Sequence, residues 1–153
     1  MQRFNTKLLA LATMGFVSAG LAAPLSAAPI EGTWVTIDDK DRSRKSLVEL
    51  VVTEEGELRG TITKLLQEKN QGLTCEKCPG DFKDKPVEGL TFMWSLEKAS
   101  EGEWRDGKIL DPKTGKVYKA RASLSEDKQE LTVRGFVGFS LFGRSQVWVR
   151  EGD

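Results

Sequence analysis

The sequence contains no histidine among its 153 residues. Histidine is the general base of Ser-His-Asp and Cys-His enzymes, so its absence excludes both kinds of nucleophilic catalysis. The absence also removes the commonest protein ligand of zinc and iron. Aspartate and glutamate are plentiful, but nothing in their spacing singles out a pair for glycoside hydrolysis. The sequence therefore favours a protein without enzymatic activity and without a resident cofactor.

The chain also lacks an excess of charge of one sign, because it contains 23 Lys and Arg residues and 23 Asp and Glu residues. Residues 1–27 carry two of the basic residues, Arg3 and Lys7, and no acidic ones. Without this segment, 21 basic residues stand against 23 acidic residues, which gives a net charge of −2. Such a balance does not indicate nucleic acid or an anionic membrane surface as the partner.

A long hydrophobic run is missing as well. The apolar stretch 8–17 is shorter than the roughly 20 residues that span a membrane. Two cations precede it, and small residues follow it as far as Ala22 and Ala27, which is typical of a cleaved signal peptide. We therefore expect residues 1–27 to be a signal peptide, with cleavage after Ala22 or Ala27. Residues 28–153 would then form one domain in the periplasm or outside the cell, with no stable membrane span.

No stretch shows a helical period, and short alternating runs separated by turn residues recur instead. Within residues 90–96, for example, Leu, Phe, Trp and Leu alternate with Thr, Met and Ser. A loop of about 20 residues, 67–88, is long for a compact domain and contains both cysteines. We expect strands at residues 33–37, 47–53, 57–66, 90–96, 103–110, 118–124, 131–137 and 141–150. About eight antiparallel strands close a single small all-β barrel able to hold one small ligand.

The last hairpin, residues 134–150, is where we expect the barrel to close. Three glycines interrupt its strand pattern, as glycines do at bulges and bends: Gly135, Gly138 and Gly143. Arg134 and Arg144 lie at similar distances from its turn, with Gln146 beyond. Antiparallel pairing would bring the two arginines together to bind a carboxylate or phosphate; alternatively, both point to solvent. Both faces are partly apolar, so one would fill the barrel and the other would meet a partner, the long loop or a second subunit.

Cys75 and Cys78 form a Cys-x-x-Cys motif with several interpretations. In an oxidising compartment an even number of cysteines favours a disulfide, which here would close a very short loop. A redox-active pair and a zinc ion bridged between two subunits are the alternatives. Covalent haem attachment would need a histidine after the second cysteine, and Pro79 is there instead.

A short acidic cluster, formed by Asp38, Asp39 and Asp41, is a weak candidate for calcium. The spacing and closing glutamate of an EF-hand are absent, and basic residues come directly after it. We expect a solvated hairpin loop in which the charges compensate one another. Asp111 precedes Pro112 and is interpreted as a turn residue whose side chain accepts hydrogen bonds from nearby backbone amides.

Several strings taken together resemble the bacterial family catalogued as domain of unknown function 2147. They lie at Gly32–Trp34, Asp38–Asp39, Cys75–Cys78, Lys85–Leu90, Gly107–Pro112, Arg134–Gly138 and Leu141–Arg144. The resemblance covers nearly the whole chain after residue 27. It implies a secreted bacterial protein with a lipocalin-like, or calycin, barrel and no established activity.

The string Gly32-x-Trp34 is also similar to the Gly-x-Trp signature of calycins generally. In that group an arginine from the last strand packs across the tryptophan near the closed end of the barrel. The resemblance assigns this structural role to Arg150 or Arg144. A guanidinium over an indole contributes about 0.5–2 kcal/mol, depending on desolvation. Alternatively, Trp34 is an ordinary core aromatic residue, a role that is compatible with the arginine contact.

These patterns support three hypotheses about function. The first is a periplasmic module that binds a small apolar or amphipathic ligand, with candidate contacts at Phe92, Trp94, Tyr118, Arg134, Arg144 and Gln146. Small residues would leave room for that ligand, at Ala120, Ala122, Gly135 and Gly143. The second is an envelope protein that binds a protein partner, or a second copy of itself, through the last hairpin. The third is a thiol–disulfide enzyme built on Cys75 and Cys78.

Overall fold

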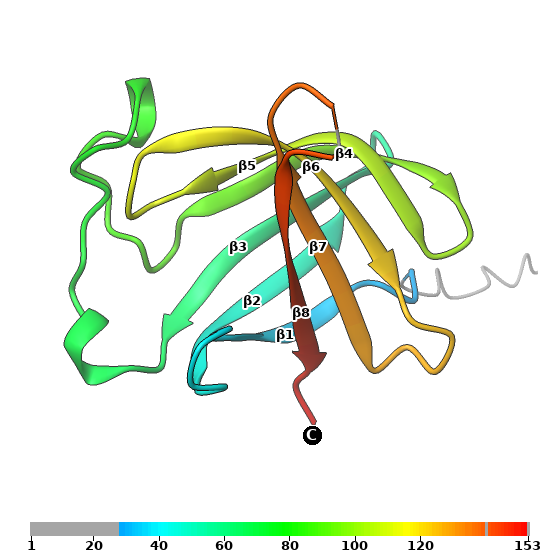
Figure 1. The fold of residues 1–153 in the computed structure, drawn as a ribbon, viewed down its shortest axis with the longest axis horizontal. Helices are drawn as coiled ribbons and strands as arrows, with labels where there is room; N and C mark the ends of the chain where they lie inside the picture. Colours follow the sequence, from blue (N-terminus) through cyan, green and yellow to red (C-terminus); the bar gives the residue numbers. More distant parts are fainter. Residues whose placement is uncertain (1–27, 140, 153) are drawn as a thin grey trace, which may run out of the picture.

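The computed structural model describes residues 28–139 and 141–152, which form a closed antiparallel barrel (Figure 1). Its strands are β1 (Gly32–Ile37), β2 (Arg44–Val52), β3 (Glu57–Leu65), β4 (Thr91–Ser100), β5 (Glu103–Asp111), β6 (Lys116–Leu124), β7 (Glu130–Phe136) and β8 (Gly143–Arg150). Each strand pairs with the next, and β8 pairs with β1 to close the sheet. The predicted all-β barrel of about eight strands is confirmed. The predicted signal peptide lies outside the described residues.

Helical structure is slight in the described chain. The long β3–β4 loop contains two short 3-10 turns, η1 (Glu68–Asn70) and η2 (Gly80–Phe82). Within residues 28–139 and 141–152, no helix has the length and apolar character needed to cross a membrane. The fold is therefore determined by strand pairing and by how the barrel interior is filled.

The barrel interior follows the strand alternation. On β2, for example, Ser46, Val48 and Leu50 are buried, whereas Glu49 between them is exposed. The largest fully buried side chains include two tryptophans from opposite ends of the sequence, Trp34 and Trp148. Burial of such side chains supplies most of the favourable free energy of folding.

One end of the barrel is sealed by Arg150. Its guanidinium lies 4.3 Å from the centre of the Trp34 ring, so Arg150, and not Arg144, lies across this tryptophan. The indole Nε1 of Trp34 donates a hydrogen bond of 2.9 Å to the carbonyl oxygen of Ile30. Gly32 has a φ of +119°, and a Cβ there would lie 3.2 Å from an Arg150 nitrogen. The glycine is therefore required both by its backbone conformation and by the arginine beside it.

The predicted alternation of residues 90–96 is wrong in part. The β3–β4 pair contains register shifts at this point. Phe92 and Met93 are both buried, and Met93 pairs with inward-facing Gly60. Trp94 pairs with exposed Lys108 and thus faces outward. Ser95, with a φ of +54°, precedes Leu96, which is buried again. Irregular residues inside a strand change the face of the next side chain, which a strict period of two does not anticipate.

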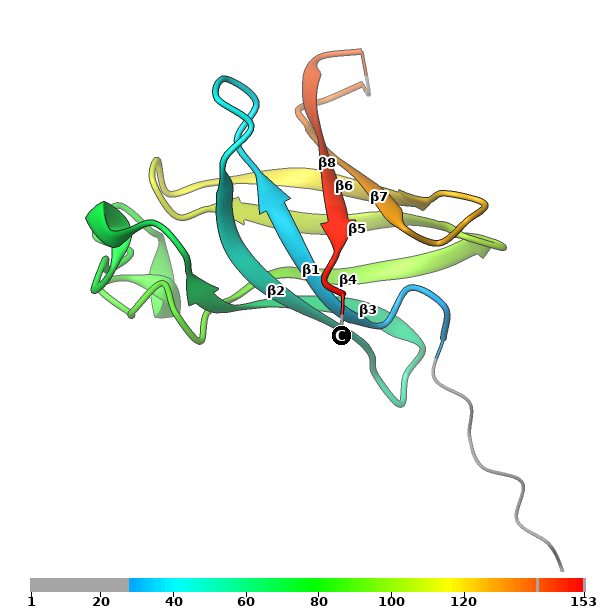
Figure 2. The same cartoon turned by 90° about the horizontal axis from the view of Figure 1, so that it is seen from below.

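The long loop is folded against the outer wall of the barrel. Its two arms are joined by the bridge between Thr74 and Pro86, and its Phe82 ring stacks on outward-facing Trp94 with centroids 5.4 Å apart. Figures 1 and 2 both show this loop, in green, beside the turn between β5 and β6. The β1–β2 and β7–β8 loops project together from one side of the barrel in Figure 2.

Candidate functional site

The open end of the barrel has inward-facing side chains that solvent can reach. On β7, Leu131 and Val133 are buried, whereas Gly135 is only partly buried. On β6, Ala122 and Ala120 are buried and Tyr118 is half-buried. Burial therefore decreases along both strands from the Arg150 end towards the other end. We call the partly exposed, inward-facing residues at this end the open-end cup.

The residues of the open-end cup come from five strands: Phe92, Ile109, Tyr118, Gly135 and Gln146. On the side of the cup formed by β5, β6 and β7, Ile109 and Tyr118 are neighbours because they pair between β5 and β6. An added Cβ at Gly135 would lie 3.3 Å from the Ile109 side chain and 3.6 Å from that of Tyr118. Ile109 and Tyr118 therefore pack closely against Gly135, and a larger side chain there would have to displace them.

The floor of the cup is aromatic with one polar group. The Phe92 ring stacks on Trp148 with centroids 6.0 Å apart. The indole Nε1 of Trp148 donates to Oε1 of Gln146 at 3.5 Å, which orients the amide. On β1, beside Trp148, the buried hydroxyl of Thr36 is hydrogen-bonded to that of Ser46 on β2 at 2.6 Å. The cup therefore combines apolar surface with a few fixed polar groups, as small-molecule sites do.

Arg144 lies at the rim of the cup. It pairs with Gly135 on β7, on the inward side, and its side chain is mostly exposed. Its Nε donates to Oδ2 of Asp39 at 2.8 Å, and its Nη2 contacts the same oxygen. This ion pair joins β8 to the β1–β2 loop at the rim of the cup.

In the acidic cluster of the β1–β2 loop, Asp38 and Asp41 accept hydrogen bonds from backbone amides of the turn. The amide of Lys40 donates to Asp38 and is the main reason that the pKa of Asp38 is lowered. The hydroxyl of Ser43 likewise lowers the pKa of Asp41. Within the described residues, no group of three or more His, Cys, Asp or Glu side chains is placed to hold a metal ion.

Two of the predicted ligand contacts lie outside the cup. Trp94 is on the outer wall under Phe82. Arg134 pairs with Ser145, whereas Arg144 pairs with Gly135, so the two arginines stand one register position apart. Adjacent positions point to opposite faces, and the predicted convergence of Arg134 and Arg144 is therefore wrong. Phe92, Tyr118, Arg144 and Gln146 do belong to the same inward face.

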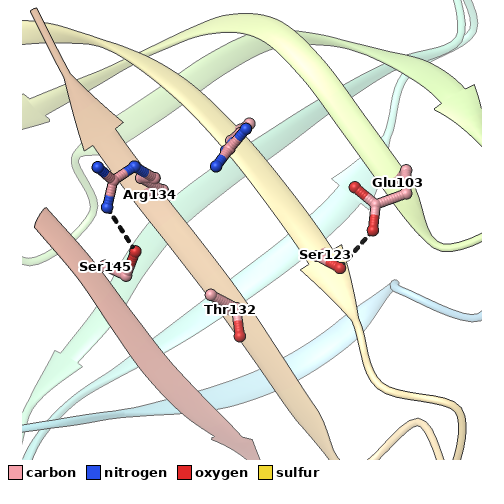
Figure 3. Close-up of a pocket in the computed structure, with 6 residues that line it drawn as sticks. Glu103, Ser123, Thr132, Arg134 and Ser145 are labelled. Carbon is pink, nitrogen blue, oxygen red and sulfur yellow. Dashed lines mark hydrogen bonds between the residues drawn. The ribbon is translucent and has the colours of Figure 1, made fainter. Parts of the chain in front are cut away.

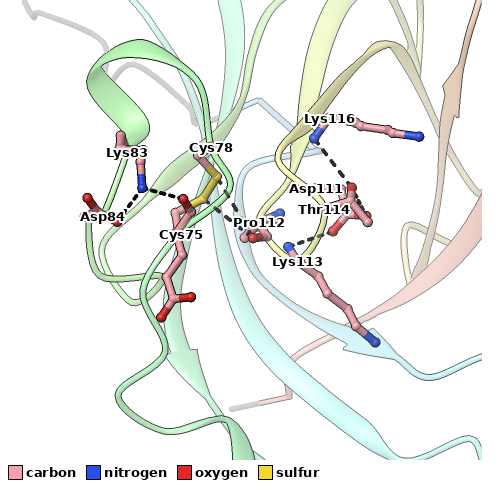
Figure 4. The surroundings of a disulfide bond; sticks show 10 residues. Cys75, Cys78, Lys83, Asp84, Asp111, Pro112, Lys113, Thr114 and Lys116 are labelled. Atoms are coloured by element: carbon pink, nitrogen blue, oxygen red, sulfur yellow. Dashed lines mark hydrogen bonds and ion pairs between the residues drawn. A yellow bond between two sulfur atoms is a disulfide. The ribbon is translucent and has the colours of Figure 1, made fainter.

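Cys75 and Cys78 are joined as a disulfide, and both are buried. Their sulfur atoms lie 3.7 and 4.0 Å from the carbonyl oxygen of Pro112 in the β5–β6 turn (Figure 4). Gly115 approaches the same segment so closely that a Cβ there would lie 1.8 Å from the Lys77 oxygen. The disulfide therefore packs against this turn. Burial of both sulfurs also argues against exchange with a partner thiol.

A groove on the outer wall was not anticipated as a site. It has a volume of about 270 Å³ and crosses β5 to β8 (Figure 3). Its lining is polar: Glu103, Arg121, Ser123, Thr132, Arg134 and Ser145. Of these six, the sequence singled out Arg134 alone. The alternation of β6 could have identified Arg121, because it places this residue on the outer face, between the inward-facing Ala120 and Ala122.

The β7–β8 loop exposes apolar side chains. Val137, Phe139, Leu141 and Phe142 are 62–83% exposed. Two of the glycines are placed differently from the prediction, since Gly138 lies in this loop with a φ of +63° and Gly143 begins β8. The predicted start of the last strand at residue 141 is thus two residues early. Trp148, in contrast, is buried in the core.

Among solved structures, the chain resembles one described as "Protein HP1028 from the human pathogen Helicobacter pylori belongs to the lipocalin family". The TM-score is 0.71 at 17% sequence identity, over 82% of this chain and 85% of that chain. At this identity the likeness shows the fold alone, a lipocalin-like barrel. A search of curated proteins found no match.

The same open-ended barrel is covered by a family model described as "Uncharacterized protein conserved in bacteria (DUF2147)", which matches residues 32–150. The matched segment begins with the glycine under Arg150 and ends with that arginine, so it includes the whole barrel. It accounts for most of the chain, and the protein therefore belongs to the DUF2147 family.

Proposed function

We propose that this protein is a binding module of the bacterial envelope that holds a small amphipathic ligand in the open-end cup. The observation that carries the proposal is the decrease in burial along β6, β7 and β8 towards the open end. The apolar part of the ligand would contact Phe92, Ile109 and Tyr118. An acidic head group would lie near Arg144, which is already at the rim.

The size of the cup limits the ligand. The lower barrel is filled by large side chains, including Trp34, Leu131 and Trp148. Tyr118 stands two residues above buried Ala120, which corresponds to a rise of about 7 Å along a strand. The cup therefore suits a ring or a short chain, and a long-chain lipid would extend into solvent.

Localisation and lack of catalysis are parts of the same proposal. The charged start, apolar run and small residues of segment 1–27 support export to the periplasm or beyond. The absence of histidine and the burial of the disulfide support a protein that binds without catalysing a reaction.

Titration with the fluorescent dye 1-anilinonaphthalene-8-sulfonate tests the cup, because the dye carries apolar rings and an anionic group. We expect saturable binding of one dye per chain. Gly135→Val introduces a side chain that must displace Ile109 and Tyr118, two residues of the cup, and should weaken binding about tenfold, while its melting curve shows that the barrel is folded. Phe142→Ser is the matched control for dye binding to the exposed loop and should leave the affinity unchanged. Equal affinity for the wild type and Gly135→Val would reject the cup.

The charge at the rim is tested with a neutral analogue, N-phenyl-1-naphthylamine. Arg144→Gln should weaken the sulfonate dye by about threefold to tenfold, since the contact is exposed, and leave the neutral dye unaffected. A loss of the same size for both dyes would mean that Arg144 acts only on the shape of the rim.

A second candidate is self-association through the β7–β8 loop. It is favoured by the four exposed apolar side chains, of which Phe139 and Leu141 are the most exposed. Sedimentation of the wild type should then show a dimer at high concentration, and Phe139→Ser with Leu141→Ser should abolish it. A wild type that stays monomeric at every concentration would eliminate this candidate.

A further inference from the structure

The polar groove on the outer wall brings like charges together. Arg121 on β6 pairs directly with Arg134 on β7, and both line the groove. In the next row towards the open end, Lys108 pairs with Lys119. Like charges directly opposite on neighbouring strands destabilise a sheet. The chain has no excess of basic residues, so this cluster is a local feature and not the result of composition.

The rest of the lining supplies hydroxyls and one acid. Arg134 donates from Nη1 to the hydroxyl of Ser145 at 3.0 Å and from Nη2 to the carbonyl oxygen of Leu141 at 3.4 Å. At the other end, the hydroxyl of Ser123 donates to the carboxylate of Glu103. Figure 3 shows Arg134 and Glu103 on opposite sides of the groove. The groove is thus cationic at one end and acidic at the other.

We propose that this groove binds a phosphate ester that carries hydroxyl groups. The phosphate would lie at Arg121 and Arg134, because two guanidinium groups match phosphate oxygens in geometry and charge. A hydroxyl of the ligand would donate to Glu103, the acid in the lining. At about 270 Å³ the groove has room for a small polar molecule. Bound phosphate would also offset the repulsion between the paired arginines.

This chemistry has two sources, a soluble sugar or glycerol phosphate and the head group of phosphatidylglycerol. The first arm of the test is an NMR titration of the full domain with glycerol 3-phosphate at constant ionic strength. We expect saturable shifts of the Ser123, Thr132 and Ser145 amides. The second arm is co-sedimentation with vesicles of phosphatidylglycerol, with phosphatidylcholine vesicles as the control. Binding in either arm supports the site and identifies its source, and binding in neither overturns the proposal.

Substitutions assign the binding to the groove. Arg121→Gln should weaken it about tenfold, and it should fold normally because it removes a like-charge contact from an exposed position. Lys64→Gln removes an exposed cation from β3 and should have no effect. Glu103→Gln should weaken glycerol 3-phosphate and leave inorganic phosphate unchanged. Equal losses in Arg121→Gln and Lys64→Gln would reduce the binding to general charge attraction and overturn the proposal.

The groove and the cup are independent. Gly135→Val, which displaces residues of the cup, should leave glycerol phosphate binding intact, and Arg121→Gln should leave dye binding intact. Competition between the dye and glycerol phosphate would contradict two separate sites.

Discussion

Removing the guanidinium of Arg150 should strongly destabilise the barrel. This group donates to three carbonyl oxygens at 2.6–3.0 Å, those of Pro29, Glu31 and Lys128. A net gain of about 0.5–1.5 kcal/mol for each hydrogen bond is typical. The contact with Trp34 adds about 0.5–2 kcal/mol. Arg150→Met keeps the apolar stem and loses these interactions, so it should cost about 3 kcal/mol, a large share of the 5–15 kcal/mol that ordinarily separates folded from unfolded protein.

Urea unfolding followed by tryptophan fluorescence measures this loss. With a slope of about 2 kcal/mol per molar urea, the midpoint of Arg150→Met should fall by about 1.5 M. The matched control is Arg144→Met, which removes an arginine from the same strand and the same face. Its side chain is 68% exposed and forms a surface ion pair, so it should lose at most about 1 kcal/mol. Equal midpoints for the two variants would refute the assignment of Arg150 as the residue that seals the barrel.

Three further predictions concern other parts of the fold. Gly107→Ala would place a Cβ 2.3 Å from Cγ of Leu96, and thermal unfolding should show a loss of about 2 kcal/mol from overpacking. Replacing Cys75 and Cys78 by Ala should cost about 2 kcal/mol in urea and speed proteolysis within the long loop, because a short disulfide loop restricts the unfolded chain modestly. The hydroxyl of Ser125 lowers the pKa of Asp127 below its unfolded value of 3.8. The contribution of this carboxylate to folding stability is therefore present above pH 3.8 and is lost as the pH falls through the lower folded pKa. Asp127→Asn should make stability less sensitive to acid below about pH 4, as measured by unfolding at a series of pH values.

The barrel was predictable because its strands alternate regularly and its turns carry glycine, proline or clustered polar residues. The prediction failed where the backbone departs from regular strand geometry. Ser95 and Asp106 both have positive φ inside strands, at 54° and 59°. Asp106 precedes Gly107 and is a residue type that adopts positive φ readily, so a bend there was predictable, whereas nothing in the side chain of Ser95 marks it as a bulge position. Each residue alters the face on which the neighbouring side chains lie. The outward position of Trp94 has another cause, the register shift beside Phe92 and Met93, which are both buried.

The candidate site was predictable to the extent that it depends on one strand at a time. Tyr118 was identified because its neighbours on β6 alternate cleanly, and Gln146 because it lies just beyond Arg144 in the sequence. Whether Arg134 faces into or out of the barrel depends on its register against Ser145, and an offset of one residue would reverse that face. Arg121 was overlooked for the same reason, since its significance comes from the residue opposite it. Pairwise register across strands is a property of the folded sheet, and the linear pattern records it only indirectly.

Native mass spectrometry of the protein purified from its own envelope without detergent tests the central claim most directly. The wild type should carry an added small-molecule mass, and Gly135→Val purified in the same way should lack it. The added mass would also begin to identify the ligand of the cup. A wild-type chain that is bare, or an added mass that survives in Gly135→Val, would contradict the account of an open-end binding site.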